Sequence, residues 1–218
     1  MFLDEKMKKM KKNANFVRKE RVPMNILVAV TAASGALYAR QLLEMLLASP
    51  QVERVGLILS ERAAEVAAWE GVTLPGDGRI VRFRNDDLFA SPASGSARWE
   101  AMAVCPCSVG TVGRVAAGTA RTLIERAADV MLKERRRLIL VVRETPLSLV
   151  HLRNMVSLTE AGAVILPASP SFYSRPADVE ALCRTVVERI GALLGLDTPR
   201  YVWGAEAGDE KVVFSEGE

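Results

Sequence analysis

Two charged residues follow directly after an aliphatic run, at a position where α/β proteins commonly bind ligands. Residues 138–142 read Leu-Ile-Leu-Val-Val, and Arg143 and Glu144 come next. A continuous apolar run of this length is typical of a strand that is covered on both faces. Ligands in open α/β sheets bind beyond the carboxyl ends of the strands. An Arg and a Glu at that place therefore indicate an anion site with a proton donor or acceptor.

The segment before this run carries further charges. Arg126, Asp129 and Lys133 are spaced so that they share one face of a helix. A surface ion pair between Asp129 and Lys133 would contribute only about 0.2–0.5 kcal/mol. The basic turn at 135–137 would suit the C-terminus of a helix. Taken alone, the stretch supports a structural and a functional interpretation equally.

Three other segments share a composition of small and hydroxyl-bearing residues: Thr31–Ala36, Ser91–Ser96 and Cys107–Thr111. Such loops can bind phosphate through backbone N–H groups, especially where they open a helix. None matches the Walker pattern or the G-x-G-x-x-G fingerprint, and Ser and Gly also occur at helix starts as ordinary caps. Together, in an α/β domain, the three loops favour a mononucleotide ligand, and FMN suits a domain of this size.

The remaining candidates have simpler explanations. His151 is the only histidine, so no transition-metal site is predicted, and we interpret it as a packed or capping residue. Cys107 has no His nearby in sequence to activate it and is interpreted as a small residue packed under a loop. Trp69 and Trp99 are assigned to the core or to an interface, whereas Trp203 lies in a Pro/Gly-flanked segment that favours a ligand contact.

The composition fits one soluble domain. The chain has 218 residues, half of them hydrophobic, which is enough for one full core. No apolar run approaches the length of a membrane span. The three cysteines cannot form an even disulfide framework, and Cys105 and Cys107 are too close for an ordinary bridge. Reduced thiols in the cytoplasm are therefore expected.

The basic character of the chain belongs to its N-terminal tail. Residues 1–22 hold eight Lys or Arg and three acidic residues, so the other 196 carry 21 bases and 23 acids of the 29 and 26 in total. Nucleic acid is therefore not a predicted partner. We predict a disordered extension over 1–23, with Met24 as an alternative start, although a basic tail also suits acidic surfaces. The domain is expected over 24–204, followed by a tail over 205–218.

Strands and helices are expected to alternate. Buried strands are predicted at 25–30, 52–59, 79–83, 101–104, 138–142 and 163–166, with helices between them. Gly162 would end the helix over 147–160. Pro176 would lie in the first turn of the last helix, whose buried face would run from Val179 to Leu194. The expected fold class is α/β, a single doubly wound domain with a mainly parallel sheet.

Together, these motifs resemble the flavin prenyltransferase (UbiX) family. The likeness extends from about Met24 to Trp203, and the block from Arg126 to Pro146 is its most specific part. The residues that match the family are 31–36, 92–96, 105–108, 125–136, 143–147, 151–152, 162–167 and 172–173.

The resemblance implies a Rossmann-like, flavodoxin-type fold, a homododecamer and a prenyl transfer that needs no metal. Members of the family join a dimethylallyl group from dimethylallyl phosphate to N5 and C6 of reduced FMN. Their product, prenylated FMN, is the cofactor of partner decarboxylases, including those of ubiquinone biosynthesis.

The resemblance also implies which residues form the site. Small and hydroxyl-bearing residues at strand ends, with one arginine, would contact FMN: Thr31, Ala32, Ala33, Ser34, Ser60, Ser108, Val109, Gly110, Thr111 and Arg143. Dimethylallyl phosphate would be held, partly across a subunit boundary, by Arg126, Lys133, Tyr173 and Arg189. Ser34, assisted by Glu70, would act beside flavin N5. Glu144 would handle protons at the leaving phosphate, and Trp203 would face the allylic cation.

One departure and two alternatives accompany this interpretation. The family usually has Gly where this chain has Ala32, and Ala adds a methyl group and disfavours positive φ. An FMN-dependent cysteine decarboxylase of similar fold is a weaker match, since those enzymes use a His on the first helix. A non-catalytic FMN carrier would have no need of a second anion site such as Lys133 and Arg189 would form.

Overall fold

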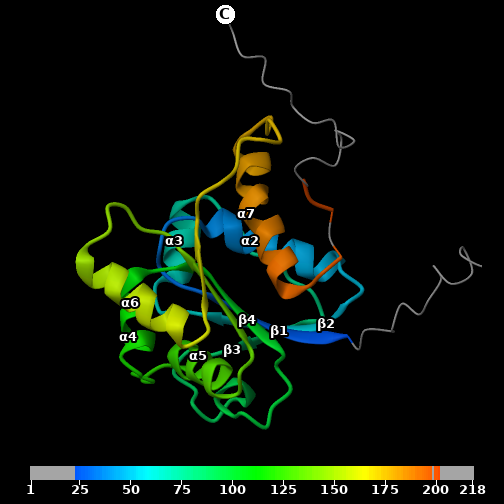
Figure 1. Cartoon of the computed structure of the whole chain (residues 1–218). Coiled ribbons are helices and arrows are strands. Elements are labelled where there is room, and N and C mark those ends of the chain that lie inside the picture. Colours follow the sequence, from blue (N-terminus) through cyan, green and yellow to red (C-terminus); the bar gives the residue numbers. More distant parts are fainter. Residues whose placement is uncertain (1–22, 198, 202–218) are drawn as a thin grey trace, which may run out of the picture.

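The computed structural model describes residues 23–197 and 199–201, which form a parallel sheet with helices on both faces (Figure 1). The sheet order is β3-β2-β1-β4-β5-β6, and each neighbouring pair is parallel. The strands are β1 (Met24–Val30), β2 (Val52–Leu59), β3 (Ile80–Phe83), β4 (Ala101–Cys107), β5 (Arg137–Val142) and β6 (Val164–Pro167). The order reverses between β1 and β4, which marks the switch point where doubly wound sheets bind ligands. The predicted fold class is confirmed.

In the described part of the chain, six α-helices cover the sheet in two layers. Over one face lie α2 (Ala36–Ala48), α3 (Ala63–Trp69) and α7 (Val179–Leu194), and over the other lie α4 (Val109–Ala116), α5 (Leu123–Lys133) and α6 (Leu149–Glu160) (Figure 1). Successive strand residues alternate between the two cores. Val28 packs toward α2 and α7, whereas Leu27 and Ala29 pack toward α4 and α5. Because both faces are covered, the strands are aliphatic throughout.

Two predicted boundaries were wrong. Strand β4 continues to Cys107, three residues beyond the predicted end, because the Cys-Pro-Cys segment stays fully buried between the helical layers. Helix α7 begins at Val179, so Pro176 is not in its first turn. The carboxylate of Asp178 accepts a hydrogen bond of 2.7 Å from the backbone N–H of Ala181 and caps the helix there. Val179 is 67% exposed, contrary to the predicted buried face.

Helix α6 is the least buried of the long helices. Its N-terminus is capped reciprocally, because the N–H of Ser148 donates to Nδ1 of His151 at 3.2 Å and Ser148 Oγ accepts from the N–H of His151 at 3.3 Å. The capping interpretation of His151 is therefore confirmed. Within α6 only Leu158 is fully buried, and large apolar side chains face outward. These exposed residues are Leu149, Val150, Leu152 and Val156. No helix within 23–197 and 199–201 is long and apolar enough to cross a membrane.

Gly162 directly follows the C-cap of α6 and has φ of 101°, as predicted for a left-handed cap. A Cβ at Gly162 would meet nothing within 4 Å, and the same holds for Gly78, whose φ is outside the left-handed region. We predict that Gly162→Ala lowers the free energy of unfolding by about 1–2 kcal/mol through backbone strain alone. Gly78→Ala should change it by less than about 0.5 kcal/mol.

Urea unfolding of the two variants and the wild type measures both values. Equal effects of the two substitutions would show that the left-handed conformation of Gly162 does not determine the end of α6.

Candidate active site

Thr31 links the two strands at the switch point. Its buried hydroxyl donates to the carbonyl of Pro106 at 2.8 Å and accepts from the backbone N–H of Ser108 at 2.9 Å. The N–H of Thr31 also donates to the Pro106 carbonyl, at 3.2 Å. The loops that follow β1 and β4 are thereby held side by side. The hydroxyl of Thr31, which was predicted to contact FMN, is already engaged within the protein.

Glu70 fills the N-terminus of α2. It follows the last residue of α3, and its carboxylate accepts from the N–H of Gly35 at 2.8 Å and from the N–H of Ala36 at 2.7 Å. The side chain of Ser34 donates to the same carboxylate. First-turn N–H groups have no acceptor within their own helix, so a carboxylate at this place is stabilising. The predicted association of Ser34 with Glu70 is present.

The charge of Glu70 is fixed by its neighbours. Burial raises the pKa of the carboxyl. Hydrogen bonds from Ser34, Gly35 and Ala36, with the nearby positive charge of Arg143, together lower the pKa by more than burial raises it. The pKa of Glu70 is therefore below its ordinary value. Glu70 is therefore ionised at neutral pH and accepts hydrogen bonds only. Because the Ser34 hydroxyl donates to Glu70, the Ser34 oxygen keeps lone pairs for another donor.

The loop between β1 and α2 depends on Gly35 rather than on Gly at position 32. Gly35 has φ of 111°, and a Cβ there would lie 2.8 Å from the ring of Tyr38. Among the described residues, positive φ outside glycine occurs at Arg135 and Arg175. Ala32 therefore has no left-handed backbone, and its methyl group causes no strain of that kind. The sequence interpretation overlooked Tyr38, which packs beneath the loop.

Ser60 offers a polar atom that fits a bound ligand. It follows the last residue of β2, and its N–H donates to the carbonyl of Val30 at 2.9 Å. Its Oγ is buried and has no hydrogen-bond partner among the described residues. A buried hydroxyl without a partner is costly, so a polar ligand group at this place would be stabilising. With exposed Ala32 and Ser34 beside it, the strand-end surface fits the FMN contacts that were predicted.

The first turn of α4 forms the other side of the switch point. Ser108 is the N-cap, and its Oγ accepts from the N–H of Thr111 at 3.4 Å and lies 3.1 Å from Thr111 Oγ1. The first turn contains no acidic residue. Gly110 is exposed, and Val109 is partly buried. Hydroxyls and first-turn N–H groups without a nearby carboxylate form an environment suited to an anion.

Arg126 and Lys133 lie apart from this switch point within one chain. Arg126 Nε donates to the carbonyl of Ala93 at 3.0 Å, and Lys133 Nζ lies 2.8 Å from the place that a Cβ on Gly95 would take. The predicted loop at 91–96 is therefore grouped with these cations. Lys133 precedes β5 and Arg143 follows it. A strand of this length spans roughly 20 Å, so Lys133 and Arg143 lie at opposite edges of the sheet.

The ion pairs of α5 differ from the one weighed in the sequence. Asp129 pairs with Arg126, at 2.5 Å, and Lys133 pairs with Glu134. The structural interpretation of Asp129 is therefore supported. Its partner is Arg126, one turn before it, and not Lys133, one turn after it. Lys133 remains close to the surface, since its side chain is 44% exposed.

Arg189 lines a cavity of about 490 Å³ beyond the end of β6. Arg200, Ser169, Ser171 and the acidic Glu188 line the same cavity, so two arginines and one carboxylate border it, a balance that favours an anion. The sequence interpretation did not select Arg200. Tyr173 lies on the preceding loop and is mostly exposed.

Of the last two predicted catalytic residues, the structure describes Glu144 but not Trp203. Glu144 is exposed, and its carboxylate accepts from the backbone N–H of Thr145 at 3.0 Å. It adjoins Arg143 at the end of β5, so it lies at the carboxyl edge of the sheet. Trp203 lies outside the described residues, and its predicted role stays a prediction.

The environment of Cys107 disfavours thiol chemistry. Cys107 is fully buried, and burial raises the pKa of its thiol to about 12, although the positive charge of Arg114 lowers it somewhat. A thiol with that pKa is not a nucleophile at neutral pH, so the packed interpretation of Cys107 is confirmed. Within the part of the chain that the structure describes, no three His, Cys, Asp or Glu side chains gather as around a metal ion.

The switch point and its hydroxyl-lined helix start are those of a nucleotide-binding α/β protein, and the profile of the Flavoprotein family matches residues 15–191. The chain belongs to the flavin prenyltransferase UbiX family, as the sequence predicted. It is 46% identical over 205 residues to Flavin prenyltransferase UbiX of Pseudomonas aeruginosa, with 84% of this chain and 96% of the relative covered.

Two solved structures are similar over most of their length. AnUbiX, solved with FMN and dimethylallyl pyrophosphate, is 39% identical with a TM-score of 0.76, and 83% of this chain and 98% of that chain are covered. A dodecameric FMN-dependent UbiX-like decarboxylase from Escherichia coli is 37% identical with a TM-score of 0.76, with 83% and 99% covered.

The lowered pKa of Glu70 makes a testable contribution to stability. Ionised Glu70 stabilises the fold above the ordinary glutamate pKa of 4.5, and this contribution is lost as the pH falls through the lower pKa of the folded state. We predict that Glu70→Gln lowers the free energy of unfolding by about 1 kcal/mol at pH 7. The difference from wild type should shrink below pH 4.5.

Urea titrations at pH 7 and at acid pH measure this difference. Glu53→Gln, at an exposed glutamate in β2 away from any helix start, is the matched control and should stay close to wild type at both pH values. A penalty for Glu70→Gln that is independent of pH would contradict the assigned ionisation.

Proposed function

We propose that this protein transfers a dimethylallyl group from dimethylallyl phosphate to N5 and C6 of reduced FMN, without a metal, and releases prenylated FMN. The observation that carries the proposal is the cluster of Ser34, ionised Glu70 and Arg143 at the switch point. Membership in the UbiX family and the ligands of AnUbiX support it.

The flavin side of the site would be held at the carboxyl ends of β1, β2, β4 and β5. The reduced flavin supplies the nucleophilic N5 and the carbon that closes the new ring. The hydroxyl of Ser34 donates its proton to Glu70, so its oxygen would accept a hydrogen bond from the N–H of reduced N5 and fix the position of the flavin. Ser60 Oγ, without another partner among the described residues, would bind a polar flavin atom. Arg143 would place a positive charge beside the ring system.

The phosphate side requires charge dispersal. When the allylic C–O bond breaks, its electron pair leaves with the phosphate, so cations that bind the phosphate more strongly as it departs lower the barrier. We assign this role to Arg126, Lys133, Tyr173 and Arg189. Glu144 would exchange the proton of the leaving phosphate. Arg189 and Arg200, which line one cavity, support the assignment of that region to the phosphate.

The site is proposed to form between copies of the chain in a homododecamer. Lys133 and Glu144 lie on either side of β5, separated by roughly the 20 Å span of that strand, which is too far for one small phosphate to contact both. A neighbouring copy would supply Lys133. The outward apolar residues of α6 and exposed Trp69 fit an assembly that buries them, and the E. coli relative is a dodecamer.

The product would pass to a decarboxylase that uses prenylated FMN. Reduced thiols and a reduced flavin substrate both fit the cytoplasm. The exposed strand-end surface at Ala32 and Ser34 allows the flavin to leave after modification.

Anaerobic incubation with reduced FMN and dimethylallyl phosphate tests the reaction. We predict that mass spectrometry shows a flavin that has gained one five-carbon unit, together with free phosphate. A parallel incubation with dimethylallyl diphosphate determines which donor is used. Oxidised FMN is the control and should remain unmodified, because it has no N–H at N5.

Other outcomes identify the alternatives. Tight FMN binding with both donors intact would indicate a carrier. Release of carbon dioxide from a peptide with a C-terminal cysteine, with the flavin unmodified, would indicate a cysteine decarboxylase. Either result would overturn the prenyl transfer.

Mixed assemblies test whether Lys133 and Glu144 act from different copies. We predict that Lys133→Ala and Glu144→Gln are each nearly inactive while still binding FMN. Subunits of the two variants, mixed in equal amounts and allowed to exchange, should recover about a quarter of wild-type activity, since that fraction of shared sites receives both intact residues.

Lys133→Ala subunits taken alone through the same exchange procedure are the control and should stay inactive. If the mixture of the two variants stayed inactive although mass spectrometry showed mixed assemblies, Lys133 and Glu144 would not complement one another across a subunit boundary.

A further inference from the structure

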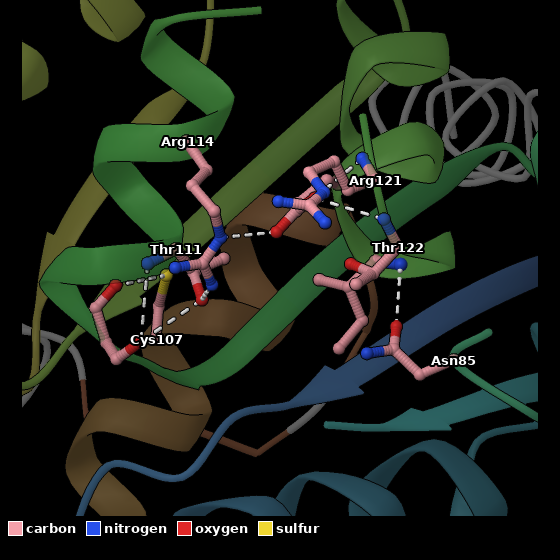
Figure 2. A network of polar contacts seen from close by, with 9 residues as sticks. Asn85, Cys107, Thr111, Arg114, Arg121 and Thr122 are labelled. Carbon is pink, nitrogen blue, oxygen red and sulfur yellow. Dashed lines mark hydrogen bonds and ion pairs between the residues drawn. The ribbon is translucent and has the colours of Figure 1, made fainter. Parts of the chain in front are cut away.

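Arg114 on α4 and Glu125 on α5 form an ion pair that the mechanism above does not use. Arg114 Nε donates to Oε1 of Glu125 (Figure 2). The Glu125 side chain is 2% exposed, whereas that of Arg114 is 49% exposed. Glu125 also belongs to the capping box that starts α5, so it has a structural role of its own, whereas Arg114 extends from the pair to the first turn of α4.

Glu125 is held firmly. Its second oxygen, Oε2, accepts from the backbone N–H of Arg121 at 2.8 Å and of Thr122 at 3.1 Å. The next N–H groups of the turn are satisfied by Asn85, whose Oδ1 accepts from the N–H of Ile124 at 3.0 Å (Figure 2). Burial raises the pKa of Glu125, whereas Arg114 and these N–H groups lower it by a larger amount. The pKa of Glu125 is therefore below its ordinary value. Glu125 is thus an ionised, fixed anchor for Arg114.

The two terminal nitrogens of the Arg114 guanidinium lie against the first turn of α4. Arg114 Nη2 donates to Thr111 Oγ1 at 3.2 Å. A Cβ on Gly110 would be 3.3 Å from Arg114 Nη1. The guanidinium therefore lies along the turn that also contains the pair of Ser108 and Thr111 hydroxyls.

This arrangement limits the hydrogen bonds that the Thr111 hydroxyl can make. A guanidinium donates only, so Thr111 Oγ1 accepts from Arg114 and its own proton must point elsewhere. If that proton goes to Ser108 Oγ, the proton of Ser108 stays available, and if Ser108 donates instead, the proton of Thr111 stays available. Either way one hydroxyl proton of the pair is left for another acceptor beside the first-turn N–H groups of α4. The turn presents donors, which suits an anion.

We propose that Arg114 and Glu125 are positioning residues that hold the Ser108–Thr111 hydroxyl pair in place for the phosphate group of the flavin, through the hydrogen bond from Arg114 to Thr111. The inference rests on the proposed function in that FMN is taken as the ligand. Arg114 acts through Thr111, and Glu125 acts by holding Arg114. Riboflavin, which lacks the phosphate, should not sense this arrangement.

Fluorescence titrations with oxidised FMN and with riboflavin test the proposal without any turnover. We expect Arg114→Gln to raise the Kd for FMN roughly tenfold, which corresponds to losing one charge-assisted hydrogen bond between the turn and the phosphate. The Kd for riboflavin should change less than about twofold. Glu125→Gln should show the same preference for losing FMN. Arg114→Lys keeps the charge and should recover part of the affinity.

Arg84→Gln is the matched control, since it removes one arginine and one ion pair, with Asp86, that is exposed and outside the network. Its affinities should equal those of wild type. Wild-type FMN affinity in Arg114→Gln, or an equal loss for FMN and riboflavin, would overturn the positioning role, the latter by showing a general effect on the fold.

The two proposals fail in different ways. A selective FMN loss in Arg114→Gln, with a wild type that makes no prenylated flavin, would support the positioning role and reject the prenyl transfer. Product formation by the wild type with unchanged FMN affinity in Arg114→Gln would do the reverse. A wild type that binds no FMN would reject both.

Discussion

The hydroxyl of Thr31 is the contact on which the geometry of the site depends. It joins loops that are 75 or more positions apart in the sequence, by donating to Pro106 and accepting from Ser108. At the switch point the chain leaves β1 toward one face of the sheet and β4 toward the other, so the two loops diverge. One buried hydroxyl with both functions satisfied fixes their spacing, and the starts of α2 and α4 follow from it.

The two helix starts at the switch point are electrostatically different. The N-terminus of α2 already holds a carboxylate of the chain itself, because Glu70 accepts from Gly35 and Ala36. The N-terminus of α4 has no acidic residue in its first turn. An external anion is therefore directed away from α2 and toward α4. Arg143 lies close enough to Glu70 for its positive charge to lower the pKa of that carboxyl.

The sequence predicted what depends on short-range pattern. Aliphatic runs located every strand, and Gly162 located the end of α6. The pair of Arg114 and Glu125 was not predicted, since it joins two helices and no periodicity relates such residues. Lys133 and Arg143 are ten positions apart, and the sequence placed them in one functional stretch. Strand β5 lies between them and carries the chain from one end of the sheet to the other, so Lys133 and Arg143 are far apart in space.

The separation of Lys133 from the switch point constrains how the proposed chemistry is organised. A cation that binds a leaving phosphate must be within contact distance of it, and no side-chain rotamer of Lys133 spans a strand of six residues. The proposed FMN contacts, in contrast, would come from strand ends that one chain brings together, at Thr31, Ser60 and Arg143. In the proposed arrangement a single chain would bind the flavin, whereas breaking the allylic bond would require a second copy. Assembly would then control catalysis through the phosphate and leave flavin binding largely unaffected.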